Sequence, residues 1–426
     1  MFDLFSTQKF NSIISLFSGA GIGDKGLETS GFQFIVHNEK EKLKTALIKR
    51  NFPDSYVMEG DILQLETDII KNTKNHLQGN ELLAIVATPP CQGMSQNGLG
   101  TLLNNIKQGK RPQLDPRNRL ILPVLRITAK LRPQWLIIEN VPQMETTIIE
   151  DDDGEFIKIL DVINKYLGQE YAGEYQIIEC ADYGIPQRRK RLIAVYSRLE
   201  FAKKMLKDGY SFIPPITHDK LGRNGLKKWV TIRDAIAHFP PLDSYSKTTA
   251  CHPNIPLHYV PVLDSKKYNW IRHTPENESA FNNQCINPDC GFQNNPNHGT
   301  MRDSSGINRA KKNTPLYCIK CGSLLPRPYT VNQDKTIRIM SGFTSAYKRM
   351  NWDLPASTLT RNFSYPCSDN KIHPEQNRVL SLAEACKLQT ISDFEYYWGE
   401  IIINGQKYKQ ASDTTIRDAI GESVPP

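Results

Sequence analysis

The chain has 426 residues, and its 53 lysines and arginines exceed its 45 aspartates and glutamates, which gives a formal net charge of +8. This length accommodates two or three domains of about 150 residues each. The longest apolar runs, such as residues 82–87, are far shorter than the ~20 residues that cross a bilayer, which excludes a membrane-spanning protein. No export signal is recognisable, so we expect a cytoplasmic protein, and the positive charge mildly favours a phosphate-bearing partner.

The first 200 residues alternate short apolar runs with helical stretches, a pattern typical of parallel strands joined by crossover helices in an α/β fold. The expected strands are residues 12–17, 32–36, 82–87, 135–139, 175–180 and 192–196. The expected helices are residues 39–51, 118–131 and 155–167. The acidic run at residues 150–153 is interpreted as a solvated loop.

The composition changes between about Pro214 and Pro374, where proline, asparagine, glycine and tyrosine are frequent and periodic segments are few. We expect a separate, loop-rich domain there. Helical spacing returns at residues 378–389, where Leu382, Ala385 and Leu388 can share an apolar face.

The first expected strand ends in a glycine-rich turn that opens into a helix, Phe17-Ser18-Gly19-Ala20-Gly21-Ile22-Gly23. Glycine allows positive φ angles and close approach of a ligand, and a helix N-terminus offers free N–H groups. Glu39 follows the next strand, where its carboxylate can accept hydrogen bonds from ribose hydroxyls, and Asp61 near a third strand end can accept one from an adenine amine. Together these features favour a nucleoside-containing cofactor, whereas the glycines alone are equally typical of a structural turn.

The fourth expected strand ends in Thr88-Pro89-Pro90-Cys91-Gln92-Gly93-Met94-Ser95. Two prolines stiffen the turn and present Cys91 at the carboxyl end of a strand, where open α/β sheets bind ligands. The next strand ends at Glu139, which places a carboxyl group near the same cleft. A thiol and a carboxyl group in one cleft form a candidate nucleophile and acid, and a buried inert cysteine is the alternative.

Four of the nine cysteines occur as two closely spaced pairs in the loop-rich part, Cys285 with Cys290 and Cys318 with Cys321. This spacing is typical of a zinc ribbon, in which four thiolates hold one structural zinc ion in a tetrahedron. The alternative is four unrelated thiols. The other cysteines outside the Cys91 turn are expected to be packing residues: Cys180, Cys251, Cys367 and Cys386.

The order of several sequence blocks resembles the cytosine-5 DNA methyltransferase family over nearly the whole chain. The blocks are F-S-G-A-G at Phe17, P-P-C-Q at Pro89, D-x-R-x-x-L at Asp115, E-N-V at Glu139, Q-x-R-x-R at Gln187, R-x-L-x-x-x-E-A-x-x-L-Q at Arg378 and G-E-S-V-P-P at Gly421. The resemblance implies a Rossmann-like, S-adenosylmethionine-dependent catalytic domain at residues 1–200. It also implies a target-recognition domain at 201–377, with the zinc ribbon inserted near 285–321, and a return to the catalytic domain at 378–426.

The resemblance implies that the enzyme methylates carbon 5 of a cytosine flipped out of double-stranded DNA. In that chemistry the Cys91 thiolate adds to carbon 6, Glu139 stabilises the ring at nitrogen 3, and carbon 5 takes the methyl group. Arg191 would bind the cytosine carbonyl, and Arg189 would support the pocket and a nearby phosphate. Gln187, Arg189 and Arg191 alternate, so they are expected to share one face of a strand.

The same resemblance implies further contacts with the cofactor and with DNA. The cofactor set is Phe17, Ser18, Gly19, Ala20, Gly21, Ile22, Glu39, Asp61, Ile62, Pro90, Leu120, Glu422 and Ser423. The DNA set is Gln92 and Ser95 beside the flanking phosphates, with Thr358 and Leu359 in a short recognition signature. The basic residues Lys348, Arg349 and Arg361 are further candidates for DNA contacts, and the alternative for each is a solvated surface charge. Residues 93–118 are rich in glycine, asparagine and lysine, so they are expected to form a loop that closes over the flipped base, and the alternative is a merely disordered connection. The setting would be a bacterial restriction–modification pair, with a cognate restriction endonuclease as partner and the nucleoid as location.

Three departures from the family pattern are visible. Glu422 stands where the family usually has asparagine, the zinc ribbon is not general in the family, and the family continues with a helix after the last block. Because this chain stops at Pro426, we expect either a truncated chain or a separate polypeptide that supplies that helix. A tRNA cytosine-5 methyltransferase of the same fold and a catalytically silent DNA-binding relative are the alternative functions.

Overall fold

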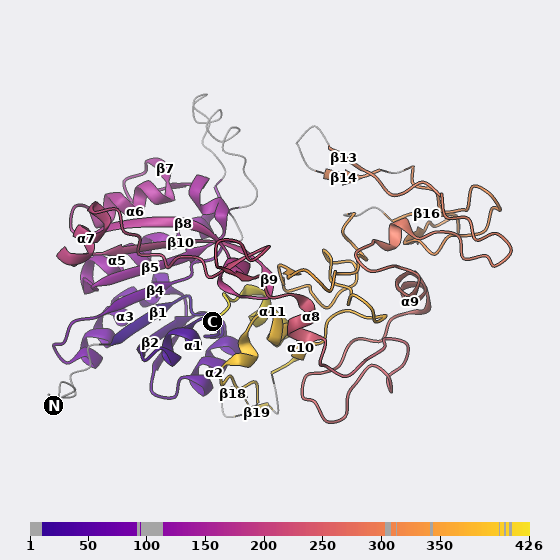
Figure 1. The fold of residues 1–426 in the computed structure, drawn as a ribbon. Helices are drawn as coiled ribbons and strands as arrows, with labels where there is room; N and C mark the ends of the chain where they lie inside the picture. The colour runs from indigo at the N-terminus through magenta and orange to yellow at the C-terminus, as the bar shows by residue number, and fades with distance from the viewer. Residues whose placement is uncertain are drawn as a thin grey trace.

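The computed structural model describes residues 11–91, 94, 114–302, 308–311, 313–340, 344–399, 401–403, 406–408 and 411–426. A seven-stranded sheet with the order β3-β2-β1-β4-β5-β10-β8 forms the first part of the chain (Figure 1). Its strands are β1 (Ser12–Leu16), β2 (Gln33–Glu39), β3 (Tyr56–Glu59), β4 (Ala84–Ala87), β5 (Trp135–Asn140), β8 (Ala172–Glu179) and β10 (Lys190–Ser197). Each expected strand is present within a few residues.

The sheet is mixed, because β10 pairs antiparallel with both β5 and β8, while β1 to β5 are parallel. The expectation of parallel strands throughout is therefore wrong for residues 192–196. The physical reason lies in the connection: only the short helix η3 (Cys180–Tyr183) and the two-residue strand β9 (Gln187–Arg188) separate β8 from β10. A parallel neighbour needs a crossover of a dozen residues or more, usually a helix.

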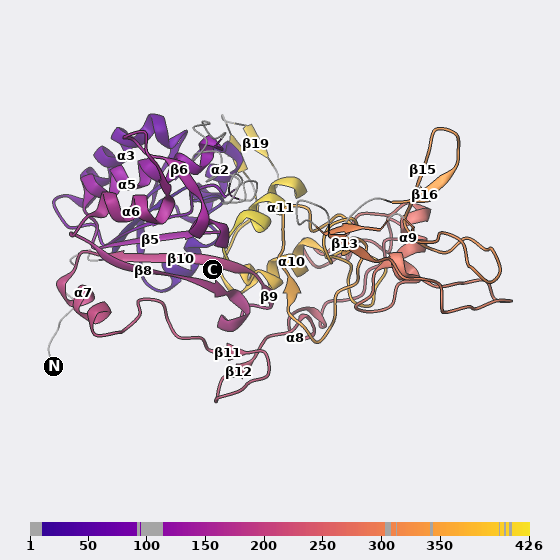
Figure 2. The same ribbon diagram turned by 90° about the horizontal axis from the view of Figure 1, so that it is seen from above.

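Helices cover both faces of this sheet, as the view from above shows (Figure 2). They are α1 (Asp24–Thr29), α2 (Lys42–Asn51), α3 (Ile62–Leu77), α5 (Ile121–Leu131), α6 (Ile159–Leu167) and α7 (Glu200–Lys207). The expected helix 39–51 begins only at Lys42, because β2 extends to Glu39, and residues 156–158 form strand β7 before α6 begins. Helix α3 was not expected, although Ile62, Ile69 and Leu77 lie on one buried stripe at helical spacing.

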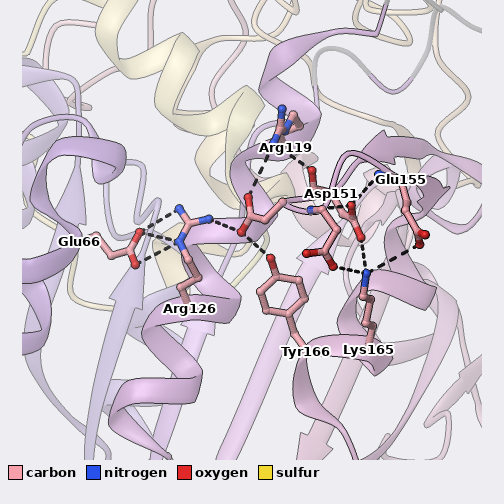
Figure 3. A network of polar contacts seen from close by, with 9 residues as sticks. Glu66, Arg119, Arg126, Asp151, Glu155, Lys165 and Tyr166 are labelled. Carbon is pink, nitrogen blue, oxygen red and sulfur yellow. Dashed lines mark hydrogen bonds and ion pairs between the residues drawn. The ribbon is translucent and has the colours of Figure 1, made fainter. Parts of the chain in front are cut away.

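The acidic run between β6 (Ile148–Glu150) and β7 (Phe156–Lys158) is held by ion pairs (Figure 3). Asp151 is only 2% exposed, and its Oδ2 lies 2.7 Å from Lys165 Nζ on α6. Asp152 Oδ2 lies 2.9 Å from Arg126 Nη1 on α5 and accepts a hydrogen bond from Tyr166. The expectation of a solvated loop is therefore wrong for Asp151, whereas Asp152 and Asp153 are exposed as expected, and these carboxylates tie the β6–β7 hairpin to two helices.

The loop-rich part lies at one end of the molecule in both views and has its own core, built around Trp270, Phe281 and Tyr347 (Figures 1 and 2). The elements between α7 and α10 are β11 (His218–Asp219), β12 (Lys227–Lys228), α8 (Ile232–Ile236), α9 (Ser265–Arg272), β13 (Thr300–Arg302), β14 (Asn308–Ala310), β15 (Tyr329–Val331), β16 (Ile337–Ile339) and β17 (Ala356–Ser357). Of these, β11 packs against η3 and β17 pairs with β9, so both lie next to the sheet. Helices α10 (Leu382–Leu388) and α11 (Asp413–Glu422) lie between this part and the sheet, and β18 (Ile401–Ile403) and β19 (Gln406–Tyr408) form a hairpin beside α2. None of the described helices is both long and apolar enough to cross a membrane.

A fully buried ion pair fixes the start of α10. Ser381 and Glu384 form a capping box, and the Glu384 carboxylate also accepts two hydrogen bonds of 2.7 Å from the guanidinium group of Arg378. Both side chains are 0% exposed. The loop-rich part therefore rejoins the sheet domain through a completely desolvated salt bridge.

Replacing Glu384 by alanine is expected to lower the free energy of unfolding by about 3–5 kcal/mol, because the buried Arg378 charge loses its carboxylate. Urea unfolding followed by circular dichroism measures this loss. The matched control is Asp353→Ala, which breaks the exposed pair of Arg233 Nε and Asp353 Oδ1 at 2.9 Å and is expected to cost less than about 1 kcal/mol. Equal losses in the two variants would contradict the assigned role of the buried pair.

Candidate active site

The candidate site lies at the carboxyl edge of the parallel strands. The sheet order reverses direction between β1 and β4, and ligands of open α/β sheets bind at such a switch point. Cys91 follows β4, Glu139 is near the end of β5, and Glu39 ends β2. The thiol and both carboxylates are therefore brought to one edge by the strands that carry them.

Glu139 and Arg191 form a close ion pair across β5 and β10. Arg191 Nε lies 2.7 Å from Glu139 Oε1, and each side chain is 13% exposed. Burial raises the pKa of Glu139, while the charges of Arg191 and Arg189 lower it. A carboxyl group with a raised pKa retains a proton more readily, so Glu139 is suited to act as an acid.

Cys91 lies exposed at the surface beside this ion pair. Partial desolvation raises the pKa of its thiol, and the nearby guanidinium group of Arg191 acts in the opposite direction by favouring the thiolate. The turn that carries Cys91 is held by Asn140, whose Nδ2 donates to the Pro89 carbonyl at 2.9 Å. Sequence reasoning missed Asn140, although it belongs to the same E-N-V block as Glu139.

Arg189 is buried, with 1% of its surface exposed. Its guanidinium group donates to three carbonyl oxygens, those of Leu359, Gly421 and Ser423. The expected phosphate contact is therefore wrong, because these backbone groups and not solvent surround the side chain. The expectation that Gln187, Arg189 and Arg191 lie on one strand is also wrong, because Arg189 lies between the end of β9 and the start of β10. Arg189 therefore joins the segment at Leu359 to the last block of the chain.

The glycine-rich turn between β1 and α1 borders open space. Phe17 has a φ of +59°, an uncommon conformation for a bulky side chain, and Gly19 and Gly21 also have positive φ angles. A β-carbon on Gly19 would meet no atom of the described part of the chain within 4 Å, whereas one on Gly21 would lie 2.6 Å from the Phe52 ring. Gly21 is thus needed for packing, and Gly19 leaves room for a ligand.

Glu39 closes one side of this turn. Its Oε2 accepts the Gly19 N–H at 2.9 Å, and its Oε1 accepts the N–H groups of Lys40 and Glu41. Burial raises the pKa of Glu39, which these hydrogen bonds and the charge of Lys44 partly offset. The carboxylate is therefore fixed beside the space at Gly19.

The remaining cofactor candidates have mixed surroundings. Asp61 accepts the Leu63 N–H as the N-cap of α3 and pairs with Lys40 at 2.9 Å, a capping role that the sequence analysis missed. Ala20, Ile22 and Ile62 have buried side chains that pack in the core, so only their backbone groups are left for a ligand. The partly buried residues are Ser18, Pro90 and Leu120.

Comparison with known proteins decides the family. The model of the family described as C-5 cytosine-specific DNA methylase matches residues 11–426. The chain belongs to this family. The methylase is 28% identical over 425 residues to the type II methyltransferase M1.HgaI of Avibacterium volantium, with 97% of this chain and 94% of the relative covered.

Two further likenesses are consistent with this membership. The type II methyltransferase M.AquIA of Picosynechococcus is 32% identical over 246 residues, which cover 54% of the methylase and 89% of the relative. A solved structure, assigned as a prophage-encoded DNA modification methyltransferase of E. coli, superimposes with a TM-score of 0.53 and 17% identity. The alignment covers 97% of this chain and 94% of that chain, and it shows a common fold.

The last block of the methylase docks on helix α2 of the seven-stranded-sheet part. Glu422 ends α11, and its carboxylate oxygens pair with Lys44 on α2 at 2.5 Å and with Arg361 at 3.0 Å. The Ser423 carbonyl accepts hydrogen bonds from Arg189 and Gln389. Of the two expected cofactor residues of this block, Glu422 therefore lies beside α2, the helix that follows Glu39, and Ser423 lies beside Arg189 and Gln389.

The candidate DNA contacts of the methylase need several corrections. Leu359 is 0% exposed in the core, and Arg349 is 3% exposed with its guanidinium group bonded to carbonyl oxygens and to Asn377, so both predicted contacts are wrong. Thr358 Oγ1 donates to the Arg188 carbonyl, and Arg361 is half exposed. Lys348 is partly buried. Gln92, Ser95 and most of the expected closing loop lie outside the described residues.

The cysteine pairs of the methylase come together at one point. Cys285, Cys290, Cys318 and Cys321 have sulfur atoms within 4.8 Å of one another, with 3.6 Å between Cys285 and Cys321 and 4.0 Å between Cys290 and Cys318. Cys180 and Cys386 are buried, as expected of packing residues. The same expectation is wrong for Cys251 and Cys367, which are exposed.

Proposed function

We propose that the chain is the modification methyltransferase of a type II restriction–modification system, which methylates carbon 5 of a flipped cytosine in double-stranded DNA. The observation that carries the mechanism is the meeting of Cys91 with the Glu139–Arg191 ion pair at the carboxyl edge of the sheet. The cellular setting is supported by the full-length likeness to a type II methyltransferase, and a cognate restriction endonuclease is the proposed partner.

The reaction begins at carbon 6 because carbon 5 of cytosine is too weak a nucleophile on its own. The Cys91 thiolate adds to carbon 6, and ring nitrogen 3 takes a proton or a strong hydrogen bond from Glu139. The ring is then an enamine, and its carbon 5 would take the methyl group of a bound sulfonium donor, whose sulfur would keep the bonding electron pair and leave as a neutral thioether. Loss of the carbon 5 proton then expels the Cys91 thiolate and leaves 5-methylcytosine.

Arg191 supports both partners of this step. Its guanidinium group favours the thiolate of Cys91 and fixes the carboxyl group of Glu139 at 2.7 Å. It is also the donor proposed for the cytosine carbonyl. Arg189 holds the strand junction that presents Arg191, through its three bonds to backbone carbonyls.

The residues at the glycine-rich turn fit S-adenosylmethionine, which supplies a methyl group on a positively charged sulfur. Among the described residues, no atom lies within 4 Å of the β-carbon position of Gly19, and the Glu39 carboxylate accepts the Gly19 N–H beside this space. Glu39 is the proposed acceptor for the ribose hydroxyls. Phe17, Pro90 and Leu120 are the proposed apolar neighbours of the adenine.

The four clustered cysteines fit a structural zinc ion that stabilises the loop-rich domain. A tetrahedron with Zn–S bonds of about 2.3 Å has sulfur atoms about 3.8 Å apart, close to the 3.6 and 4.0 Å separations measured between facing cysteines. The ion would join the segment of Cys285 and Cys290 to the segment of Cys318 and Cys321. Among the described residues, these two segments share no β-sheet. The proposed recognition domain is thus built around a metal as well as a small apolar core.

The test uses DNA in which 5-fluorocytosine replaces every cytosine, so that any recognition sequence is present. Fluorine at carbon 5 cannot leave as a proton, and the adduct between Cys91 and carbon 6 is therefore trapped. We expect a covalent protein–DNA complex that forms only with S-adenosylmethionine present and that maps to Cys91 by mass spectrometry. A trapped adduct at another residue, or turnover of ordinary DNA without any trapping, would refute the mechanism.

A further inference from the structure

A series of charged side chains connects the segment after β17 with the helix that follows Glu39. Arg361 Nη1 lies 3.0 Å from Glu422 Oε1, and Glu422 Oε2 lies 2.5 Å from Lys44 Nζ. The Lys44 side chain is 8% exposed, so its ammonium group is largely withdrawn from solvent. The carboxylate of Glu422 therefore spans two cations that come from different parts of the chain.

The backbone around this bridge is tightly docked. A β-carbon on Gly421 would lie 2.3 Å from the Arg361 nitrogen, so only glycine lets the end of α11 approach residues 360–361 this closely. Arg189 donates to the carbonyls of both Leu359 and Ser423 and holds the same two segments together. A shift of the segment that carries Arg361 would therefore move Glu422 as well.

The other end of the bridge reaches the cofactor site. Lys44 lies among three carboxylates, since it also pairs with Glu41 Oε1 at 3.1 Å and interacts electrostatically with Glu39. Its charge stabilises the ionised form of Glu39, which burial disfavours. The position of the Lys44 ammonium group, set by Glu422, thus affects the carboxylate proposed to hold the ribose.

We propose that Lys44 and Glu422 are positioning residues through which Arg361, in the segment after β17, controls the affinity for the cofactor. The inference rests on the proposed cofactor site at Glu39. A neutral side chain at position 422 could not take this role, because only a negative charge attracts both Lys44 and Arg361. By thermodynamic linkage, the coupling is reciprocal. Binding of the cofactor must therefore change the free energy of docking the Arg361 segment by the same amount as docking changes the free energy of cofactor binding.

The test measures binding of S-adenosylhomocysteine, the product of methyl donation, to the full chain by calorimetry. Glu422→Gln and Arg361→Gln are each expected to raise the Kd about 3- to 10-fold, within the range of typical coupling between sites. The Kd of the double variant should be no higher than that of the weaker-binding single variant, because both substitutions break the same bridge. The KM for S-adenosylmethionine should rise while kcat at saturation stays within about twofold.

Two controls separate this role from simple loss of stability. Arg361→Lys keeps the charge and is expected to retain most of the affinity. Asp418→Asn removes a second ion pair of Arg361, at 3.2 Å, and leaves the link to Glu422 intact, so its Kd should stay within about twofold.

The outcomes that would overturn the proposal are distinct from those that would overturn the cofactor site. Unchanged Kd values in Glu422→Gln and Arg361→Gln, or losses that multiply in the double variant, would refute the bridge. If Glu39→Gln weakens binding while those two variants do not, the bridge alone fails. If Glu39→Gln binds as tightly as the unaltered chain, the proposed cofactor site itself fails.

Discussion

Replacing Cys91 by serine is expected to abolish methyl transfer, with a rate loss of at least ~10⁴-fold, because a serine hydroxyl is far less ionised and less nucleophilic than a thiol. Binding of DNA and of S-adenosylhomocysteine should remain within a few-fold of the unaltered chain, because Cys91 lies exposed at the site and supports no buried structure. Transfer of tritiated methyl groups to bacterial DNA measures the rate, and a filter-binding assay measures retention of DNA.

The matched control is Cys251→Ser. Cys251 is also an exposed thiol, but it lies in the loop-rich part and belongs to no proposed site. Its substitution should leave the rate of methyl transfer unchanged. Methyl transfer by Cys91→Ser at more than about a tenth of the original rate would mean that another group attacks the cytosine.

Loss of the metal is the second large effect that we expect. Structural zinc contributes about 10–16 kcal/mol to the folding of zinc-finger peptides at neutral pH, so the segment around the four cysteines should unfold without it. Elemental analysis should find one zinc ion per chain. Cys318→Ser should release this zinc and expose residues 285–321 to proteolysis, while the seven-stranded sheet retains its circular dichroism signal.

The control for the zinc prediction is Cys367→Ser, which alters an exposed cysteine of the same loop-rich part that is not one of the clustered thiols. This variant should keep the metal and the protease resistance. Purified chain without zinc, or Cys318→Ser with unchanged resistance, would show that the four thiols serve another purpose.

Local patterns were sufficient to predict the elements that carry the chemistry. Apolar runs identified the strands that end before Cys91 and at Glu139, and parallel strands necessarily bring their ends to one edge. The spacing of the cysteine pairs predicted that four sulfur atoms would meet, and they do. Each of these inferences needs only a short stretch of sequence and a general rule of geometry.

Features that depend on distant partners could not be predicted in this way. Glu422 and Lys44 are 378 residues apart in sequence, so no local pattern shows that their charges meet. Arg349 and Arg361 look alike as basic residues of a loop-rich segment, but tertiary packing buries Arg349 among carbonyl oxygens and leaves Arg361 half exposed. The antiparallel direction of β10 depends on the short connection from β8. The elements η3 and β9, which form this connection, were not predicted from the sequence.

The measurement that tests the central claim most directly is bisulfite sequencing of genomic DNA from a host that lacks cytosine methylation and expresses this chain. We predict that cytosines resistant to conversion occur at one short sequence throughout the genome, and that they disappear with Cys91→Ser. A genome that converts completely, although the expressed chain is folded and soluble, would contradict the assignment of DNA cytosine methylation to this chain acting alone.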